Sequence, residues 1–195
     1  MKKDLPPYVI INAPDDTQKS ILTSPAQPLT FPLSEEDKQD IQTLITKYDQ
    51  EIPSPAGLAA PQIGINKSFA FVHVPNDPTI KKWRPDLTDT MIRTILINPF
   101  LEAIGAEEST AYEACYSVAK ITGPVSRPTA VRYFAQDIEG NPIEGTAHGF
   151  LARVLQHEVD HLNGKTILDH INEEERMDIE EYIKLRQRQL ENAPE

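Results

Sequence analysis

The first clear pattern of apolar and polar positions lies between Ser34 and Gln50. Apolar side chains recur there at helical spacing, at Ile41, Leu44, Ile45 and Tyr48. Ser34 can cap the first turn, and the acidic residues directly after it favour a helix start at this point. We therefore predict an amphipathic helix that ends before Pro53. The first 33 residues hold six prolines, which predicts an extended, irregular lead-in.

The middle of the chain carries patterns typical of β-strands. The predicted strands cover residues 69–74 (FAFVHV), 95–99 (ILINP), 111–118 (AYEACYSV) and 129–137 (TAVRYFAQD). A hairpin turn is expected within DIEGNPIEG, through Gly140 and its neighbours. Residues 53–66 are rich in turn-forming residues, and PNDPTIKKWRPD is interpreted as an exposed insertion loop.

From about Thr146 the apolar period changes from two to 3.6. The segment HGFLARVLQHEVDHL is therefore predicted to be a helix, which Gly164 closes. One narrow stripe of its helical wheel contains Phe150, Val154, His157 and His161, while the other side carries Arg153, Gln156 and Asp160. We expect this helix to be largely buried, with its two histidines turned into the interior.

Short strands and helices follow one another here without a regular strand–helix alternation, which favours the α+β class. The predicted architecture has short, mainly antiparallel strands packed around the central buried helix. An N-terminal helix precedes them, and a strongly charged C-terminal helix is expected from about Glu173 to Leu190.

Composition and charge narrow the class of protein. The chain has 195 residues, 39% of them hydrophobic and 25% charged, which is typical of a soluble globular protein. A net charge of −11 and the absence of a basic block argue against direct binding of DNA or RNA. No apolar run reaches the roughly 18 residues of a membrane span, and the first residues do not resemble a signal or transit peptide. We expect a cytoplasmic protein.

The strongest chemical signal is LQHEVDHLNG, at residues 155–164. His157 and His161 stand four positions apart, so both imidazoles project from one helical face and can reach one cation. Glu158 lies about 100° further round the helix, where it can face a water instead of the cation. Two core histidines bonded to backbone carbonyls are the structural alternative, but the motif favours metal-dependent hydrolysis.

A catalytic metal site needs a third protein ligand. The downstream candidates are Asp169, His170 and the glutamates at 173–175, and none fits the spacing of the longer zinc-peptidase motif. Upstream, Cys115 lies within a predicted strand, and a thiolate is a strong ligand for first-row transition metals. A lone cysteine is more often a small buried apolar residue, so both interpretations stay open from the residues alone.

Three separated segments carry a resemblance to a known family. They are GLAAPQIG from Gly57, EACYS at 113–117 and QHEVDHLNG at 156–164. In this order they resemble the three motifs of the peptide deformylases, and the similarity extends from the first helix to about Ile171. Ala114 and Tyr116 stand where the family usually has Gly and Leu, and Pro55 stands where it has Gly.

The resemblance implies an enzyme that removes the formyl group from N-formylmethionine of nascent polypeptides and releases formate. It implies one divalent metal ion held by Cys115, His157 and His161. The family prefers ferrous iron, and nickel, cobalt or zinc can substitute. The chain would then divide into a lead-in (1–33), a catalytic metal-hydrolase domain (34–172) and a C-terminal helix with a tail (173–195).

The resemblance also implies roles for other residues. Glu158 would take the proton of the attacking water and later deliver it to the departing amine. The Gln62 amide and the Tyr116 backbone N–H would donate to the developing oxyanion. Substrate contacts are implied for Gly57, Leu58, Glu113 and Ala114. For Glu113, an ion pair with Arg127 or Arg153 is an equally good interpretation.

Two other classes of function stay open. An HExxH metallopeptidase would cut internal amide bonds, although a cysteine ligand argues against it. A relative that only binds peptides would have no need of a general base, so Glu158 argues against that class. The expected partners are formyl-Met peptides. The resemblance also implies the ribosome as a candidate partner of the C-terminal helix, as in some relatives, and this helix carries Lys184, Arg186 and Arg188 near its end.

Overall fold

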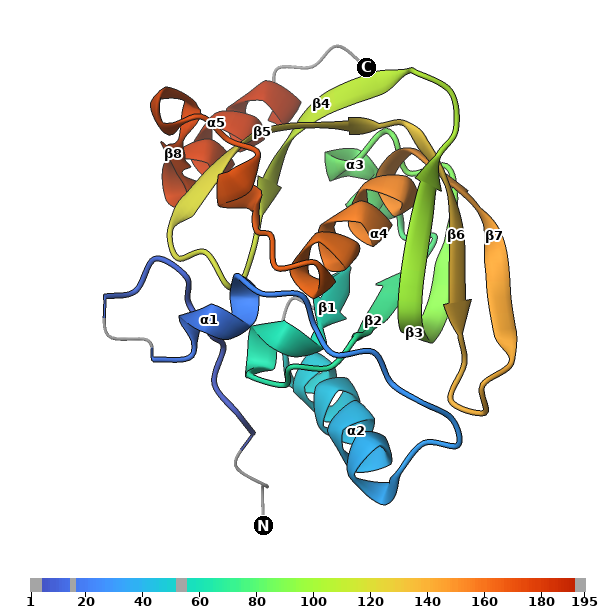
Figure 1. Ribbon diagram of the computed structural model, residues 1–195. Helices are drawn as coiled ribbons and strands as arrows, with labels where there is room; N and C mark the ends of the chain where they lie inside the picture. Colours follow the sequence, from blue (N-terminus) through green and yellow to red (C-terminus); the bar gives the residue numbers. More distant parts are fainter. Residues whose placement is uncertain (1–4, 15–16, 52–55, 192–195) are drawn as a thin grey trace.

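Two antiparallel sheets surround a central helix in the computed structural model of this protein (Figure 1). The structure describes residues 5–14, 17–51 and 56–191, so Pro55 lies outside it. The five-stranded sheet has the order β1 (Gly57–Ala59), β2 (Phe69–Val74), β3 (Met91–Ala103), β6 (Ala130–Gln136), β7 (Pro142–His148). The three-stranded sheet has the order β4 (Glu108–Ala114), β5 (Ile121–Pro128), β8 (Met177–Asp178). The prediction of an α+β fold with antiparallel strands is confirmed.

The central helix is α4 (Gly149–Leu162), and α2 (Glu35–Gln50) packs near β1 and β2 (Figure 1). Three shorter helices are α1 (Lys19–Leu22), α3 (Pro78–Trp83) and α5 (Ile179–Glu191). Single 3-10 turns cover Ala60–Ile63, Ile167–Asp169 and Glu173–Glu175. Among the helices described, none is both long and apolar enough to cross a membrane.

Helix α2 forms where its sequence predicts it. The Ser34 hydroxyl accepts a hydrogen bond from the Asp37 backbone N–H, and the Asp37 carboxylate accepts one from the Ser34 N–H, which makes a capping box. Ile41 and Leu44 are buried in a cluster with Phe69 of β2 and its neighbours. The amphipathic pattern therefore anchors α2 against the edge of the larger sheet that carries β1.

Helix α4 ends at Leu162, Asn163 is its C-cap residue, and Gly164 follows with φ +73°. A side chain at residue 164 would collide with the backbone of Ser24, because an added Cβ would lie 2.7 Å from the Ser24 nitrogen. Glycine is therefore required both for the left-handed conformation and for the close approach of the lead-in. The predicted helix HGFLARVLQHEVDHL is confirmed to within one residue, since β7 continues to His148 and α4 begins at Gly149.

Several elements differ from the predictions for physical reasons. β1 lies within the segment predicted to be turn-rich, because its three residues are all buried and show no alternation. β5 was missed because Gly123 and Pro124 interrupt its pattern. The predicted insertion loop contains α3, whose first turn is capped by Asp77. The predicted C-terminal helix begins only at Ile179, after a 3-10 turn and β8.

Candidate metal centre and catalytic site

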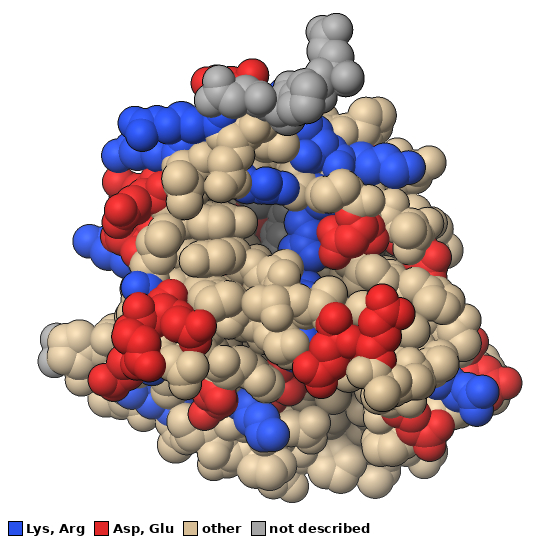
Figure 2. All heavy atoms as spheres, turned by 90° about the horizontal axis from the view of Figure 1, so that it is seen from above, with Lys and Arg blue, Asp and Glu red and all other residues tan. Residues whose placement is uncertain are grey.

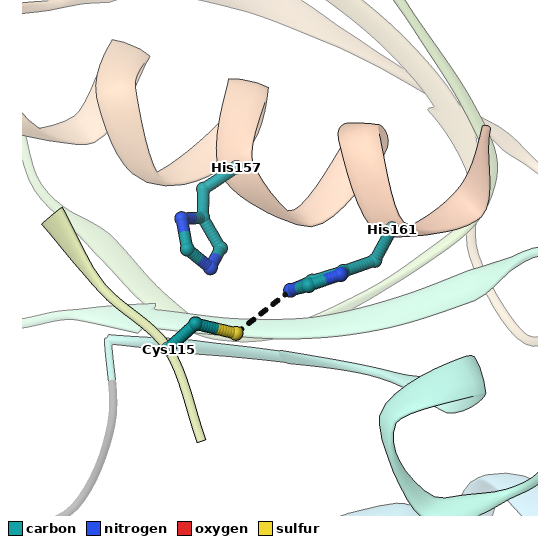
Figure 3. A group of neighbouring side chains, drawn as sticks. All are labelled: Cys115, His157 and His161. Carbon is teal, nitrogen blue, oxygen red and sulfur yellow. Dashed lines mark hydrogen bonds between the residues drawn. The ribbon is translucent and has the colours of Figure 1, made fainter. Parts of the chain in front are cut away.

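Three side chains from two parts of the chain meet beside α4 (Figure 3). Cys115 directly follows β4, whereas His157 and His161 project from one face of α4. One potential ligand atom from each residue lies within 4.8 Å of the others. The Cys115 Sγ and the His161 Nε2 are 3.2 Å apart. Cys115 was expected within a strand, but β4 ends at Ala114, which frees the cysteine to turn toward the helix.

The donor set of this cluster fits a transition metal ion. His157 Nδ1 is bonded to the Glu113 carboxylate at 2.9 Å, which leaves its Nε2 for the cluster. A thiolate with two imidazoles suits several first-row divalent ions. The remaining histidines lie elsewhere in the structure: His73 contacts Tyr48, His148 contacts Asp89 and His170 contacts Asp160.

Electrostatics favour a charged pair at Cys115. Burial raises the pKa of the Cys115 thiol, but the charges and hydrogen bonds of His161 and His157 outweigh it, and the pKa lies well below its usual value. Burial lowers the pKa of His157, yet its contacts with Cys115 and Glu113 raise the pKa well above the ordinary range. A thiolate is the form of cysteine that binds metals.

Glu158 is the buried carboxylate next to the cluster. Glu158 is only 5% exposed, and its Oε2 has no hydrogen-bond partner among the described residues. Burial raises the pKa of Glu158 to about 7, although the positive charges of His157 and His161 act in the opposite direction. A carboxylate with a pKa near neutrality can both accept and return a proton at pH 7.

Gln62 reaches the cluster from the 3-10 turn that follows β1. Its side-chain oxygen accepts a hydrogen bond from the Ala59 backbone N–H at 2.8 Å, and this fixes the direction of the amide. The Gln62 Nε2 then points at the Cys115 Sγ, 3.4 Å away. At Gly57, an added Cβ would lie 2.5 Å from Glu158 Oε1, so only glycine leaves room for that carboxylate.

A network of buried charges supports His157 from behind. The Glu113 carboxylate accepts hydrogen bonds from Arg127 Nε at 2.7 Å and Arg153 Nη1 at 2.7 Å, besides its contact with His157. The predicted ion pair of Glu113 is confirmed, and both arginines take part. Burial raises the pKa of Glu113, but His157 and Arg127 outweigh it and hold the pKa well below the usual value. Asp160 accepts from Arg127 Nη1 at 2.8 Å and extends the network.

Arg153 and Asp160 are therefore not solvent-facing residues on the polar side of α4. Arg153 is buried and also donates to the carbonyls of Val125 and Ser109. The helical wheel was misleading here because a second sheet, β4-β5-β8, covers that side of the helix. Their side chains bind the strands of that sheet instead of water.

A cavity of about 230 Å³ opens beside the cluster. It is lined by most of the residues singled out in the sequence: Gly57, Gln62, Glu113, Ala114, Cys115, Tyr116, His157 and Glu158. His161 lies deeper, and the Leu58 side chain is absent from the lining because it is buried in the core with Leu44 and Phe69. Figure 2 shows the face above β4 and α5, which is hollowed near its centre with charged side chains beside the hollow.

Other lining residues were not singled out as site residues in the sequence, among them Arg84, Tyr112 and Phe150. The Arg84 guanidinium lies 4.4 Å from the centre of the Phe150 ring, and Asp86 binds it through two hydrogen bonds. Arg84 follows α3, in the segment interpreted as an exposed loop. No local pattern in that segment signals that it folds back to the mouth of the cavity.

A thiol and two imidazoles around one point, with a buried carboxylate in the adjoining cavity, define the class of site found in metal-dependent hydrolases. The family model for polypeptide deformylase matches residues 8–177. This chain belongs to the peptide deformylase family. Members of the family remove the N-formyl group from nascent polypeptides, and the chain is a hydrolase acting on N-formylmethionine.

Individual relatives agree with this assignment. "Peptide deformylase 2" of Rickettsia conorii is 49% identical over 189 residues, which cover 96% of this chain and 93% of that protein. A peptide deformylase of Levilactobacillus brevis is 35% identical over 166 residues, which cover 80% of this chain and 87% of that protein. The crystal structure of the Acinetobacter baumannii enzyme bound to Met-Ala-Ser has a TM-score of 0.71 at 27% identity, covering 86% of this chain and 99% of that one.

Proposed function

We propose that this chain deformylates formyl-Met peptides with Glu158 as general base and acid, and with Gln62 and the Tyr116 backbone N–H as oxyanion donors. The observation that carries the proposal is the buried Glu158 carboxylate, with one oxygen lacking a partner among the described residues, beside the Cys-His-His cluster in one cavity. A buried polar atom without a partner is costly to maintain. Its presence here supports a role in chemistry.

Cys115, His157 and His161 would hold one divalent metal ion. When bound, this ion supplies Lewis-acid chemistry, which lowers the pKa of water and polarises the formyl carbonyl. We propose ferrous iron in the cell, with nickel, cobalt or zinc able to replace it, since a thiolate and two imidazoles suit all four. The contact between Glu113 and His157 would orient the ring for this purpose.

The chain's own residues would move the proton and bind the substrate. Glu158 accepts a proton from the attacking water and delivers it to the methionine nitrogen as the C–N bond breaks and formate leaves. The Gln62 Nε2 is held by the bond of its oxygen to Ala59 N–H, so it can donate to the carbonyl oxygen without losing other contacts. The Tyr116 N–H would be the second donor.

The methionine side chain would enter the inner end of the cavity. Phe150 and Val154 line the cavity and offer apolar surface for this side chain. The peptide backbone would lie between Gly57–Leu58 of β1 and Ala114 of β4, with the Leu58 contact made by its backbone, because its side chain is buried in the core. The Met-Ala-Ser bound to the Acinetobacter baumannii relative supports a peptide as the ligand of this chain.

Formate release and metal content test these assignments together. Protein purified without oxygen should carry about one metal ion per chain and release formate from formyl-Met-Ala-Ser, but leave a blocked casein-like substrate uncut. Cys115→Ala should lose both metal and activity, whereas the matched variant His148→Ala, on the outer rim of the fold, should keep both. Full metal content and activity in Cys115→Ala would contradict the proposed site and favour a peptidase-type ligand set.

A substrate that is a nascent polypeptide places the reaction where proteins are synthesised. We propose a cytoplasmic location, with residues 34–172 as the catalytic domain, and contact with the ribosome through α5. Basic side chains gather along the upper edge of Figure 2, and α5 itself carries Lys184, Arg186 and Arg188. Co-sedimentation with ribosomes should fall when these three residues are replaced by glutamate, and unchanged sedimentation would contradict the contact.

A further inference from the structure

Two tyrosines line the cavity on either side of a small residue. Tyr112 and Ala114 lie two positions apart on β4, so their side chains project from the same face of the strand, opposite to Glu113. Tyr116 follows just beyond Cys115 and also lines the cavity. Ala114 is exposed and Tyr116 is 39% exposed, so this part of the wall is open to a ligand. We call the surface formed by Tyr112, Ala114 and Tyr116 the notch.

Each tyrosine of the notch is supported by a second tyrosine from a distant part of the chain. The ring of Tyr116 stacks on Tyr8, with centroids 4.9 Å apart and planes 12° apart. The ring of Tyr112 stacks on Tyr182 of α5, with centroids 4.5 Å apart and planes 8° apart. Nearly parallel stacks restrict the rotation of both rings, so the notch is formed before a ligand arrives.

The supporting residue Tyr8 is itself held in place. The Lys47 ammonium lies 4.3 Å from the centre of its ring. The next residue, Val9, donates its backbone N–H to the Gln62 carbonyl at 2.9 Å, and Ile11 donates to the Ser117 carbonyl at 2.9 Å. The lead-in thus binds both sides of the site and cannot shift without breaking these bonds.

We propose that the notch binds the side chain of the residue that follows formyl-Met, and that it selects an aromatic side chain there. This inference rests on the proposed function, in which methionine enters the inner end of the cavity. Successive side chains of an extended peptide point in opposite directions. If methionine points inward past Glu113, the next side chain points to the opposite face of β4, where Tyr112 and Ala114 lie.

The chemistry of the notch explains why an uncharged aromatic group fits. Aromatic rings contact one another favourably through offset-stacked or edge-to-face pairs. Ala114 is small and exposed, so its side chain would not block a ring at this part of the wall. Two cations near the notch already have partners: Arg84, which lines the cavity, is bound by Asp86 at 2.7 Å, and Lys47, which contacts Tyr8, is bound by Glu51 at 3.3 Å. A charged side chain of the substrate would therefore find no free opposite charge in these pairs.

The test compares peptides that differ only after methionine. For the metal-loaded protein, the affinity for Met-Phe-Ser should exceed that for Met-Gly-Ser about tenfold, and kcat/KM for the formylated peptides should show the same ratio through KM. Tyr112→Leu and Tyr8→Leu should each reduce the ratio to about threefold or less. Tyr8→Phe should restore it, because it keeps the ring. Phe134→Leu, a matched change on the outer side of β6, should leave the ratio unchanged.

The outcomes separate the notch from the proposed function. Equal affinities for the two peptides in the unaltered protein would overturn the notch. The proposal would also be overturned if Tyr8→Leu weakened the binding of both peptides equally, because that result indicates a purely structural role for Tyr8. Selective binding of Met-Phe-Ser without formate release from any formylated peptide would support the notch and contradict the proposed catalytic assignments.

Discussion

The two long sides of α4 are held by different kinds of interaction. On one side, Leu151, Ala152 and Leu155 pack into an apolar cluster with Val72, Leu96 and Val131 of the five-stranded sheet. On the other side, charged groups from the helix bind charged and backbone groups of the three-stranded sheet, through Arg153, His157 and Asp160. One helix thus packs against apolar side chains on one side and takes part in a buried ionic network on the other.

The difference shows how stability and geometry are divided between the two sides. Apolar burial is non-directional and scales with the area removed from water, so it holds the helix against the sheet without specifying small rotations. Hydrogen-bonded ion pairs depend on distance and angle, so the network around Glu113 fixes where the His157 ring points. Changes on the apolar side should act on stability, and changes on the polar side should act first on the site.

The largest effect is expected from Glu158→Gln, which removes a proton acceptor without removing a proposed metal ligand. Turnover should fall by roughly 10²–10⁴-fold, while metal content and thermal stability stay close to those of the unaltered protein. Formate release, metal analysis and thermal unfolding measure the three quantities. Glu144→Gln on the exposed face of β7 is the matched control. Near-normal formate release by Glu158→Gln would show that another group acts as the base.

Glu113→Gln should lower the free energy of unfolding by about 3–5 kcal/mol, because Arg127 and Arg153 would keep buried charges without their partner. It should also weaken metal binding by roughly 10–100-fold, since His157 loses the group that orients it. Denaturant unfolding and metal titration measure the two effects. If stability falls but metal affinity does not, the network does not orient His157.

The same variant should change how acid affects stability. The pKa of Glu113 is held well below its usual value in the folded protein, so the unfolded chain binds this proton at a higher pH than the folded one. The resulting stabilisation is complete above the unfolded pKa and is lost as the pH falls toward the folded pKa. Glu113→Gln should therefore remove part of the acid sensitivity that the unaltered protein shows below about pH 4.5.

Leu155→Ala should cost about 2–5 kcal/mol of stability through the cavity it leaves in the apolar cluster. At a temperature where the variant is still folded, its turnover and metal content per molecule should equal those of the unaltered protein. Unfolding curves and formate release at 25 °C are the measurements. A large fall in turnover of the folded variant would mean that apolar packing also sets the geometry of the site.

The smallest effect is expected from pH. Because the pKa of Glu158 is raised to about 7, the fraction of reactive carboxylate falls as the pH is lowered, and a bound cation would move the midpoint to a lower pH. Turnover should decline by up to tenfold for each pH unit below the midpoint. The residual turnover of Glu158→Gln should lack this decline. The same profile in both proteins would assign the titration to a different group.

Features that depend on local spacing could be predicted from the sequence. The capped helix α2, the helix α4 and the inward direction of His157 and His161 all follow from apolar and polar residues three or four positions apart. Such neighbours meet within one helix, whatever the rest of the chain does. The resemblance to the family was also visible in the sequence, because each of the three motifs is a continuous segment.

Contacts between distant segments could not be predicted from the sequence and became visible only in the folded protein. The sequence placed Arg153 on a polar side of α4, and folding buried it against Glu113 and the β4-β5-β8 sheet. It gave no sign that Arg84 reaches the cavity, or that Tyr8 stacks on Tyr116 more than a hundred positions away. These contacts depend on strand register and on how two sheets enclose one helix. Side-chain periodicity records which face is buried, but not which partner lies against it.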